Sequence, residues 1–220
     1  MPDEVPWWAV ASSAAAPALL TSGWAVAGEF QTGHYDPIRQ SVSVLAGLGA
    51  TDRWVMTLAF VITAFCYMAT GIGLRAAAPA GRFMLVGAGL VGLLVAASPE
   101  PASGGFSAAH ALSSTAGFTL LAAWPLGAFQ RGPGVPWALR PAVSAGAVAV
   151  MVAVLAWFLA ELAAGGGQLG LAERVAGEVQ AVWPLMVVLS CRLAQHRTWR
   201  DAAVSPTAVP VPRSRTRSDS

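Results

Sequence analysis

Six long apolar segments constrain this chain more than any other feature of its sequence. A helix needs about 20 mainly apolar residues to cross the hydrocarbon core of a bilayer. The segments that approach this length span residues 7–28, 54–74, 83–98, 107–129, 142–162 and 175–193. Charged residues make up only 11% of the chain, against roughly 25% in soluble domains. We therefore predict an all-α fold, a polytopic membrane bundle with six transmembrane helices.

The connecting segments differ in charge, and this difference predicts how the bundle is oriented. The second connection, the fourth connection and the C-terminal segment together hold ten of the 13 basic residues, all of them Arg. The positive-inside rule places these segments in the cytoplasm, and with them both termini. The first, third and fifth connections would then face outward. We expect a multi-pass protein of the cell membrane whose partners include membrane lipids.

The sequence predicts one membrane domain and one tail. No connection is long enough for a separate soluble domain, so the transmembrane domain is expected to cover residues 1–194. Residues 195–220 are rich in Pro, Ser and Arg, which predicts a disordered basic cytoplasmic tail. A net charge of +2 is too small to indicate nucleic-acid binding. The two cysteines, Cys66 and Cys191, are isolated and give no disulfide or zinc spacing.

The first connection, GEFQTGHYDPIRQSVSVLAGLGATDRW, contains an unusual number of ionisable residues for its position between two apolar segments. Its Asp-Pro pair is typical of a helix start, with Pro37 at the first helical position. Ile38, Val42 and Leu45 would then share one apolar face. We predict a short interfacial helix on the outer surface, from Pro37 to Ala46.

Polar residues from several outward-facing segments are expected to meet at one depth. Ionisable groups near a membrane bundle are costly, so they indicate a functional site by default. We predict one outward-facing cavity lined by Asp36, Arg39, His110, Glu161 and Arg174.

Separate roles are predicted for the residues of this site. The candidate catalytic residues are His110, Asp36 and Glu161, because His carries protons near neutral pH. Two Arg could hold an anionic headgroup through paired hydrogen bonds, and we expect Arg39 to meet Glu161 or Glu178. The candidate ligand-binding residues are Arg39, Arg174, Tyr35 and Glu178.

Each of these residues also has a purely structural interpretation. Asp36 would cap a helix, Glu161 would lie in the hydrated headgroup region, and His110 would be a buried, hydrogen-bonded histidine. His34, Asp36, His110 and Glu161 are ligand types that suit a metal, but they form no compact ligand motif. A Ser-His-Asp hydrolase would need a nucleophile elbow that the sequence does not contain. We predict neither a metal nor another cofactor.

Several motifs in this order are similar to those of a known family. They are HYDPIRQSVSVLAGLGATDRWVMTLAF, SPEPASGGFSAAH, AAWPL, WFLAEL and GLAERVAGEVQAVWPL. From about Ser22 to Arg192 the chain resembles the actinobacterial branch of the family called domain of unknown function 998. By this resemblance the motif positions are Tyr35, Asp36, Pro37, Arg39, Ser43, His110, Glu161 and Arg174. Val44 departs from the pattern, because relatives often carry an acid there. The resemblance implies a multi-span prokaryotic membrane protein, without an activity that can be carried over.

Three classes of function fit these observations. The first is a membrane protein whose outward polar pocket binds or processes a lipid headgroup or small molecule. The second is an accessory or structural subunit without catalysis, which would use small-residue helix faces as contact surfaces. The third is a small-solute transporter, although the central halves of the helices carry almost no charge and no inverted repeat is evident. The residues favour the first class, and they leave open whether the protein is an enzyme.

Overall fold

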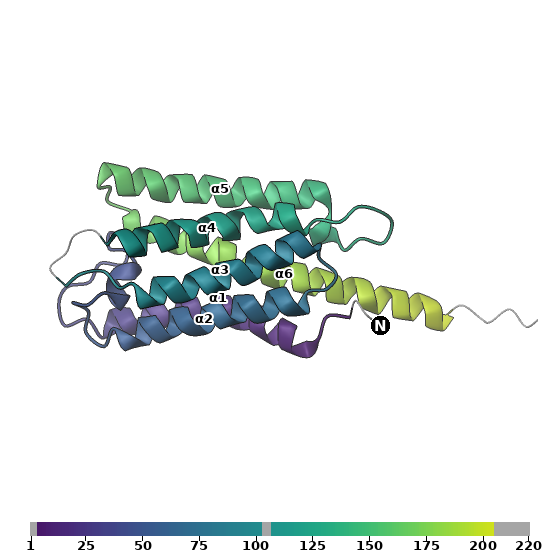
Figure 1. Cartoon of the computed structure of the whole chain (residues 1–220), viewed down its shortest axis with the longest axis horizontal. Helices are drawn as coiled ribbons and strands as arrows, with labels where there is room; N and C mark the ends of the chain where they lie inside the picture. Colours follow the sequence, from purple (N-terminus) through teal and green to yellow (C-terminus); the bar gives the residue numbers. More distant parts are fainter. Residues whose placement is uncertain (1–3, 103–106, 205–220) are drawn as a thin grey trace, which may run out of the picture.

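The protein is a bundle of long helices (Figure 1). A computed structural model describes residues 4–102 and 107–204, and these residues contain helices but no strand. The α-helices are α1 (Trp7–Glu29), α2 (Trp54–Gly73), α3 (Pro79–Ala97), α4 (Ala108–Ala128), α5 (Pro141–Ala164) and α6 (Leu169–Val204). Two 3-10 helices, η1 (Ser43–Ala46) and η2 (Trp137–Leu139), lie in the connections. The all-α prediction is confirmed.

The helices follow the six apolar segments of the sequence, and α3 and α6 begin at least four residues earlier than predicted. Helix α3 begins at Pro79, before the apolar run, because Pro suits the first helical position. Helix α6 runs from Leu169 to Val204. It therefore includes residues 195–204, which the sequence assigned to the tail. The rest of the predicted tail, residues 205–220, lies outside the described residues.

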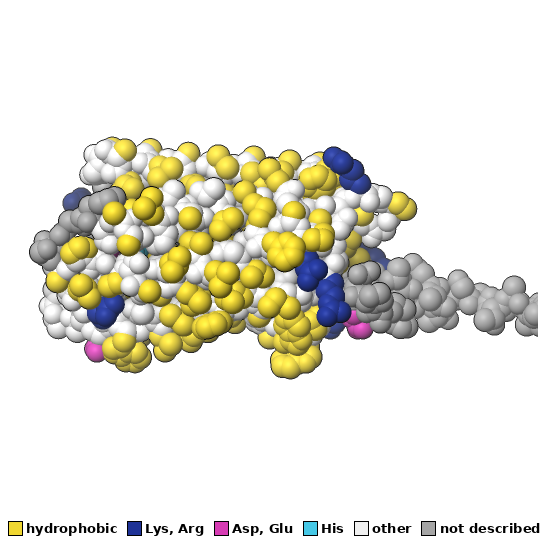
Figure 2. Space-filling model, viewed as in Figure 1, with side chains coloured by type: hydrophobic (Ala, Val, Ile, Leu, Met, Phe, Trp, Pro, Cys, Tyr) yellow, Lys and Arg dark blue, Asp and Glu magenta, His cyan; other side chains and the backbone are white. Residues whose placement is uncertain are grey.

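The surface of the bundle is suited to lipid. Helices α1, α2, α3 and α5 are each long and apolar enough to cross a membrane. Figure 2 shows hydrophobic side chains along the length of the bundle, with charged side chains gathered towards its two ends. Phe83 is 75% exposed and Leu112 is 73% exposed, which would be unfavourable in water. The chain thus fits an integral membrane protein.

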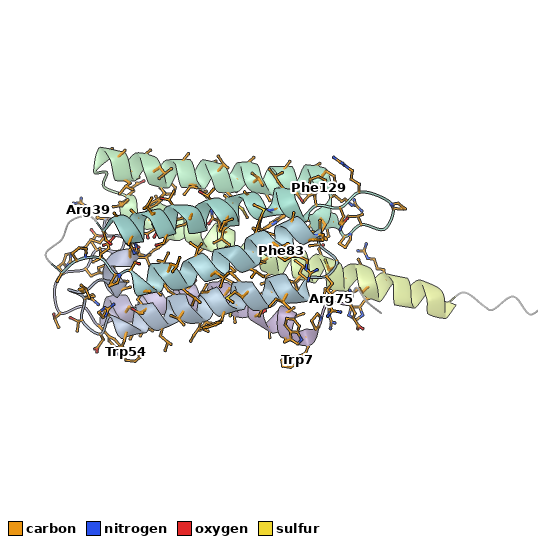
Figure 3. All side chains as sticks on the ribbon, in the orientation of Figure 1. Trp7, Arg39, Trp54, Arg75, Phe83 and Phe129 are labelled. Atoms are coloured by element: carbon orange, nitrogen blue, oxygen red, sulfur yellow. The ribbon has the colours of Figure 1, made fainter. Side chains whose placement is uncertain are left out.

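The two ends of the bundle differ in the segments they hold. One end, here called the first-loop end, carries the α1–α2, α3–α4 and α5–α6 connections; the other, the terminal end, carries the α2–α3 and α4–α5 connections (Figure 1). Trp54 lies at the first-loop end and Trp7 at the terminal end (Figure 3). Both are exposed, at 61% and 76%, and exposed Trp is typical of the interface between membrane and water.

Neighbouring helices pack through small residues. Helix α1 contacts α2, α2 contacts α3 and α3 contacts α4, while α6 packs against α1, α4 and α5. A Cβ added at Gly81 of α3 would collide with the backbone of Ala128 in α4, and one at Gly89 would collide with Ala64 in α2. Small residues let helix backbones approach closely where lipid provides no hydrophobic driving force. Helix α5 lies at the edge of the bundle, with only Ser144 and Met151 buried.

The first connection does not form the α-helix predicted from Pro37 to Ala46. Gln40 N donates to Asp36 O at 2.8 Å in a single turn, and only Ser43–Ala46 is helical, as η1. Leu45 is buried as expected, whereas Ile38 is 51% exposed. The reason lies in α6, whose side chains and backbone bond the polar groups that a local helix would have used internally.

Candidate functional site

The buried guanidinium of Arg174 ties the first connection to α6. Arg174 lies near the start of α6 and is only 7% exposed. Its Nη1 donates to the carbonyl oxygens of Pro37 at 2.6 Å, Gly170 at 2.9 Å and Gln40 at 3.2 Å. Its Nη2 donates to the hydroxyl of Tyr35. The partners of this buried cation are therefore backbone and phenol oxygens rather than a carboxylate.

Aromatic rings surround the same guanidinium. Its central carbon lies 5.0 Å from the centre of the Trp24 ring and 5.7 Å from that of the Tyr35 ring, distances at which cation–π attraction operates. Burial raises the pKa of the Tyr35 phenol, and the positive charge of Arg174 opposes this rise. The Tyr35 hydroxyl also donates to Ser41 O at 3.4 Å. Arg174 is thus held on several sides, and its direction is fixed.

The preceding residue, Glu173, holds the next part of the same connection. Its side chain is 8% exposed. Its Oε2 accepts from the backbone N–H of Val42 at 2.8 Å, and its Oε1 accepts from the hydroxyl of Ser43 at 3.3 Å. Two consecutive charged residues of α6 therefore bind two consecutive stretches of the first connection.

A close backbone approach completes this contact. Leu171 N donates to Ile38 O at 3.0 Å. A Cβ added at Gly170 would collide with the carbonyl oxygens of Pro37 and Gln40, so only glycine fits there. We call the contacts of Gly170, Leu171, Glu173 and Arg174 with residues 35–43 the loop clamp.

Asp36 and Arg39 lie outside this buried contact. Asp36 Oδ1 accepts from Ile38 N at 2.9 Å, which stabilises the local turn. Arg39 Nε lies 3.7 Å from Asp36 Oδ2, and the Arg39 side chain is 74% exposed. Figure 3 shows Arg39 at the periphery of the first-loop end. The expectation that Arg39 meets Glu161 or Glu178 is therefore wrong, because the adjacent Asp36 is its partner.

His110 and Glu161 each serve a different connection. His110 is 7% exposed, with Nδ1 2.9 Å from Ser98 O and Nε2 4.0 Å from Glu100 Oε1. It links the start of α4 to the end of α3. Glu161 Oε2 accepts from Gln168 N at 2.9 Å, which closes the α5–α6 connection. The His110 contact matches the structural interpretation of that residue as a buried, hydrogen-bonded histidine.

A cavity of about 130 Å³ lies between α1, α2, α3, α4 and α6. Most of its lining is apolar or aromatic, including Leu20, Trp24, Phe60, Tyr67, Val95, Phe118 and Leu121. Its polar lining comes mainly from Ser43, Thr63, Glu173, Arg174, Glu178 and Gln180. The cavity therefore begins beneath the loop clamp and extends between the helices.

Four buried polar atoms of this lining have no hydrogen-bond partner. They are Trp24 Nε1, Thr63 Oγ1, Gln180 Oε1 and Arg174 Nε. Thr63 is 5% exposed and Gln180 is 0% exposed, so bulk solvent does not compensate for the missing bonds. An unpaired buried polar group costs about 1–3 kcal/mol, and native proteins rarely leave one without a reason.

The cavity unites only some of the residues expected to share a site. Arg174 and Glu178 line it, and Tyr35 contacts it through Arg174. Asp36, Arg39, His110 and Glu161 are not among its lining residues. This cavity is therefore not the five-residue cavity predicted from the sequence, because four of the five side chains bond within or beside their own connections. Among the described residues, no group of three or more His, Cys, Asp or Glu is placed to hold a metal.

Sequence reasoning missed several lining residues that the fold brings together. Glu173, Gly177 and Gln180 line the cavity from one face of α6, and their spacing of i, i+4 and i+7 places them on that face. The regular spacing of these polar and small residues along an apolar helix was the sequence pattern that could have indicated the cavity. Thr63 had no such signal, since a lone Thr in an apolar run is ordinary.

Comparison with protein families gives one match, which covers most of the chain. Residues 14–190 match the family described as protein of unknown function (DUF998). The chain belongs to this family. Comparison with curated proteins and with solved structures finds no match. The matched DUF998 region includes both the loop clamp and every residue that lines the cavity.

We predict that Arg174→Lys loosens the loop clamp of this DUF998 member. An ammonium group cannot reproduce the fork of donors that reaches Pro37, Gln40 and Tyr35, so the free energy of unfolding should fall by about 2–3 kcal/mol. Hydrogen exchange of residues 35–43 should become faster. Arg39→Lys is the control, because its exposed side chain should change stability by less than about 0.5 kcal/mol. Equal changes in unfolding free energy and in hydrogen exchange in the two variants would contradict the loop clamp.

We also predict a pH dependence that arises from Glu100. Burial raises the pKa of this carboxyl above its ordinary value of 4.5; Glu173 adds to the rise, and His110 opposes it. Between the ordinary and the raised pKa the folded protein binds more protons than the unfolded chain, so stability falls as pH rises. Relative to Glu100→Gln, the wild-type unfolding midpoint should therefore drop from acidic to neutral pH. If the unfolding midpoints of wild type and Glu100→Gln changed with pH in parallel, Glu100 would not be the origin of the pH dependence.

Proposed function

We propose that this chain is a membrane protein that binds a small amphiphile or a lipid headgroup in the cavity between α1, α2, α3, α4 and α6. The four unpartnered atoms, Trp24 Nε1, Thr63 Oγ1, Gln180 Oε1 and Arg174 Nε, carry this proposal. They are buried polar groups on the wall of a cavity, where a bound molecule can supply the missing bonds. The remaining wall is apolar and suits an apolar part of the same molecule.

The contacts of the candidate catalytic residues favour binding over catalysis. His110 already bonds Ser98 O and faces Glu100, and Glu161 bonds its own connection. None of these groups is among the residues that line the cavity. A general acid or base must come within hydrogen-bond reach of the reacting group, and these side chains are committed elsewhere.

We also propose a membrane topology for this chain. In it, all six helices span the plasma membrane, both termini are cytoplasmic and the first-loop end faces outward. The concentration of Arg in the α2–α3 and α4–α5 connections and in the C-terminal segment supports this orientation. The motif order in the sequence supports assignment to the actinobacterial branch of the family.

An accessory subunit is the second candidate, and helix α5 favours it. Within α5 only Ser144 and Met151 are buried, while Val150, Val152, Leu159 and Leu162 are exposed. Such a face suits contact with lipid or with another membrane protein. This role would become the better one if the cavity held no ligand.

Filling the cavity should remove its ligand. Gly117 lines the cavity, and a Cβ there would make only ordinary contact, with Val91 at 3.6 Å. We predict that Gly117→Leu lowers the amount of small molecule that co-purifies with the protein by about tenfold, measured by mass spectrometry of organic extracts. Gly146→Leu is the matched control, since nothing lies within 4 Å of a Cβ there. Equal extracts from both variants, or an empty wild type, would refute the binding function.

The orientation can be tested with a matched pair of Arg→Cys variants. Arg39 and Arg75 are exposed and lie at opposite ends of the bundle (Figure 3), and the native Cys66 and Cys191 are buried. In intact cells a membrane-impermeant maleimide should label Arg39→Cys and leave Arg75→Cys unlabelled until the membrane is opened. The reverse pattern would invert the topology.

A further inference from the structure

The charged groups on the wall of the cavity are more anionic than cationic. Glu173 and Glu178 contribute two carboxylates, and Gln180 contributes an amide oxygen without a partner. Against these stands one cation, Arg174. With both carboxylates ionised, the charged groups of the lining sum to −1.

The single cation has little bonding capacity left. Both terminal nitrogens of Arg174 are engaged by the loop clamp, with Pro37, Gln40 and Gly170 on Nη1 and Tyr35 on Nη2. Only Nε lacks a partner. One N–H cannot form the paired bonds by which Arg holds a phosphate or carboxylate. The anionic headgroup expected from the sequence is therefore a poor match to this cavity.

The acceptors, in contrast, keep free capacity. Glu178 Oε1 accepts from the hydroxyl of Thr21 at 2.7 Å, a neutral donor that leaves the charge uncompensated. Within the described residues, neither Glu173 nor Glu178 has a cationic side chain within ion-pair distance. Gln180 Nε2 donates to Phe118 O at 3.1 Å, which orients the amide and leaves Oε1 free as an acceptor.

Aromatic rings line the same space. Trp24, Phe60, Tyr67 and Phe118 all contribute to the wall, and Trp24 already contacts one cation, Arg174. Carboxylates combined with aromatic faces are the groups by which proteins recognise ammonium ions. Glu178 is half-buried, and a half-buried carboxylate that lacks a cation gains more from an ammonium than one in water does, because the local dielectric is lower.

We infer that the occupant of this cavity is a small amphiphile whose head carries a protonated amine, held by Glu178 and by the free oxygen of Gln180. This inference rests on the proposed binding function and specifies the class of ligand. The ammonium supplies a positive charge to balance the carboxylates and N–H donors for their free acceptor positions and for Gln180 Oε1. Its apolar part lies against the aliphatic and aromatic side chains of α1 to α4.

Photo-crosslinking with matched probes tests this ligand class. Three alkyl diazirines of one chain length, ending in an ammonium, a hydroxyl or a carboxylate, are added to the full-length protein in nanodiscs of zwitterionic lipid. Adducts are mapped by mass spectrometry to the residues that line the cavity. The ammonium probe should label these residues about tenfold more than the carboxylate probe.

Charge-removing variants separate the cavity from its surroundings. Glu178→Gln should reduce labelling by the ammonium probe about tenfold and leave labelling by the hydroxyl probe unchanged, which also shows that the variant is folded. Glu161→Gln, whose carboxyl bonds the α5–α6 connection, should change neither.

The possible outcomes distinguish the two proposals. Cavity labelling by the hydroxyl or carboxylate probe at the level of the ammonium probe, or equal labelling of wild type and Glu178→Gln, would overturn the amine inference and leave the binding function standing. If none of the three probes labels the cavity, the binding function and the amine inference both fail.

Discussion

The rest of this structure depends on a charged side chain that is buried among backbone carbonyls. Arg174 is placed near the start of α6, yet its hydrogen bonds define the path of a connection that begins after α1. A buried guanidinium needs acceptors for its donors, and the carbonyls of residues 37 and 40 can accept from its Nη1 only in a non-helical path. The shape of the first connection and the polar end of the cavity therefore have one cause.

The same interaction explains which parts of the fold could be predicted from the sequence. The helices are encoded locally, in the length of the apolar runs and in Pro79 and Pro141 at the first helical positions of α3 and α5. The apolar runs therefore predicted the existence of the helices and most of their bounds. The path of residues 37–46 is encoded by Gly170 and Arg174, which are remote in sequence. A local apolar pattern predicted a helix there, because it contains no information about donors that arrive from α6.

The candidate site follows a similar division. Arg174 and Glu178 could be recognised as unusual charges beside a bilayer, and both line the cavity. The partners of these two residues could not be predicted. Arg39, which was expected to meet Glu161 or Glu178, pairs with Asp36 three residues earlier and remains in solvent. Thr63 and Gln180 acquire interest only once helix packing leaves Oγ1 and Oε1 unpaired beside a cavity. Such orphaned atoms are properties of the packed structure rather than of a motif.

The loop clamp also sets an order for assembly. Arg174 bonds Pro37 across 137 residues of chain, so α1 and α2 are synthesised and inserted long before their anchor exists. The first connection therefore stays unfastened until the start of α6 has been synthesised. A chain truncated before α6 would therefore keep α1 to α5 but lack every donor and acceptor that fixes the path of its first connection from α6.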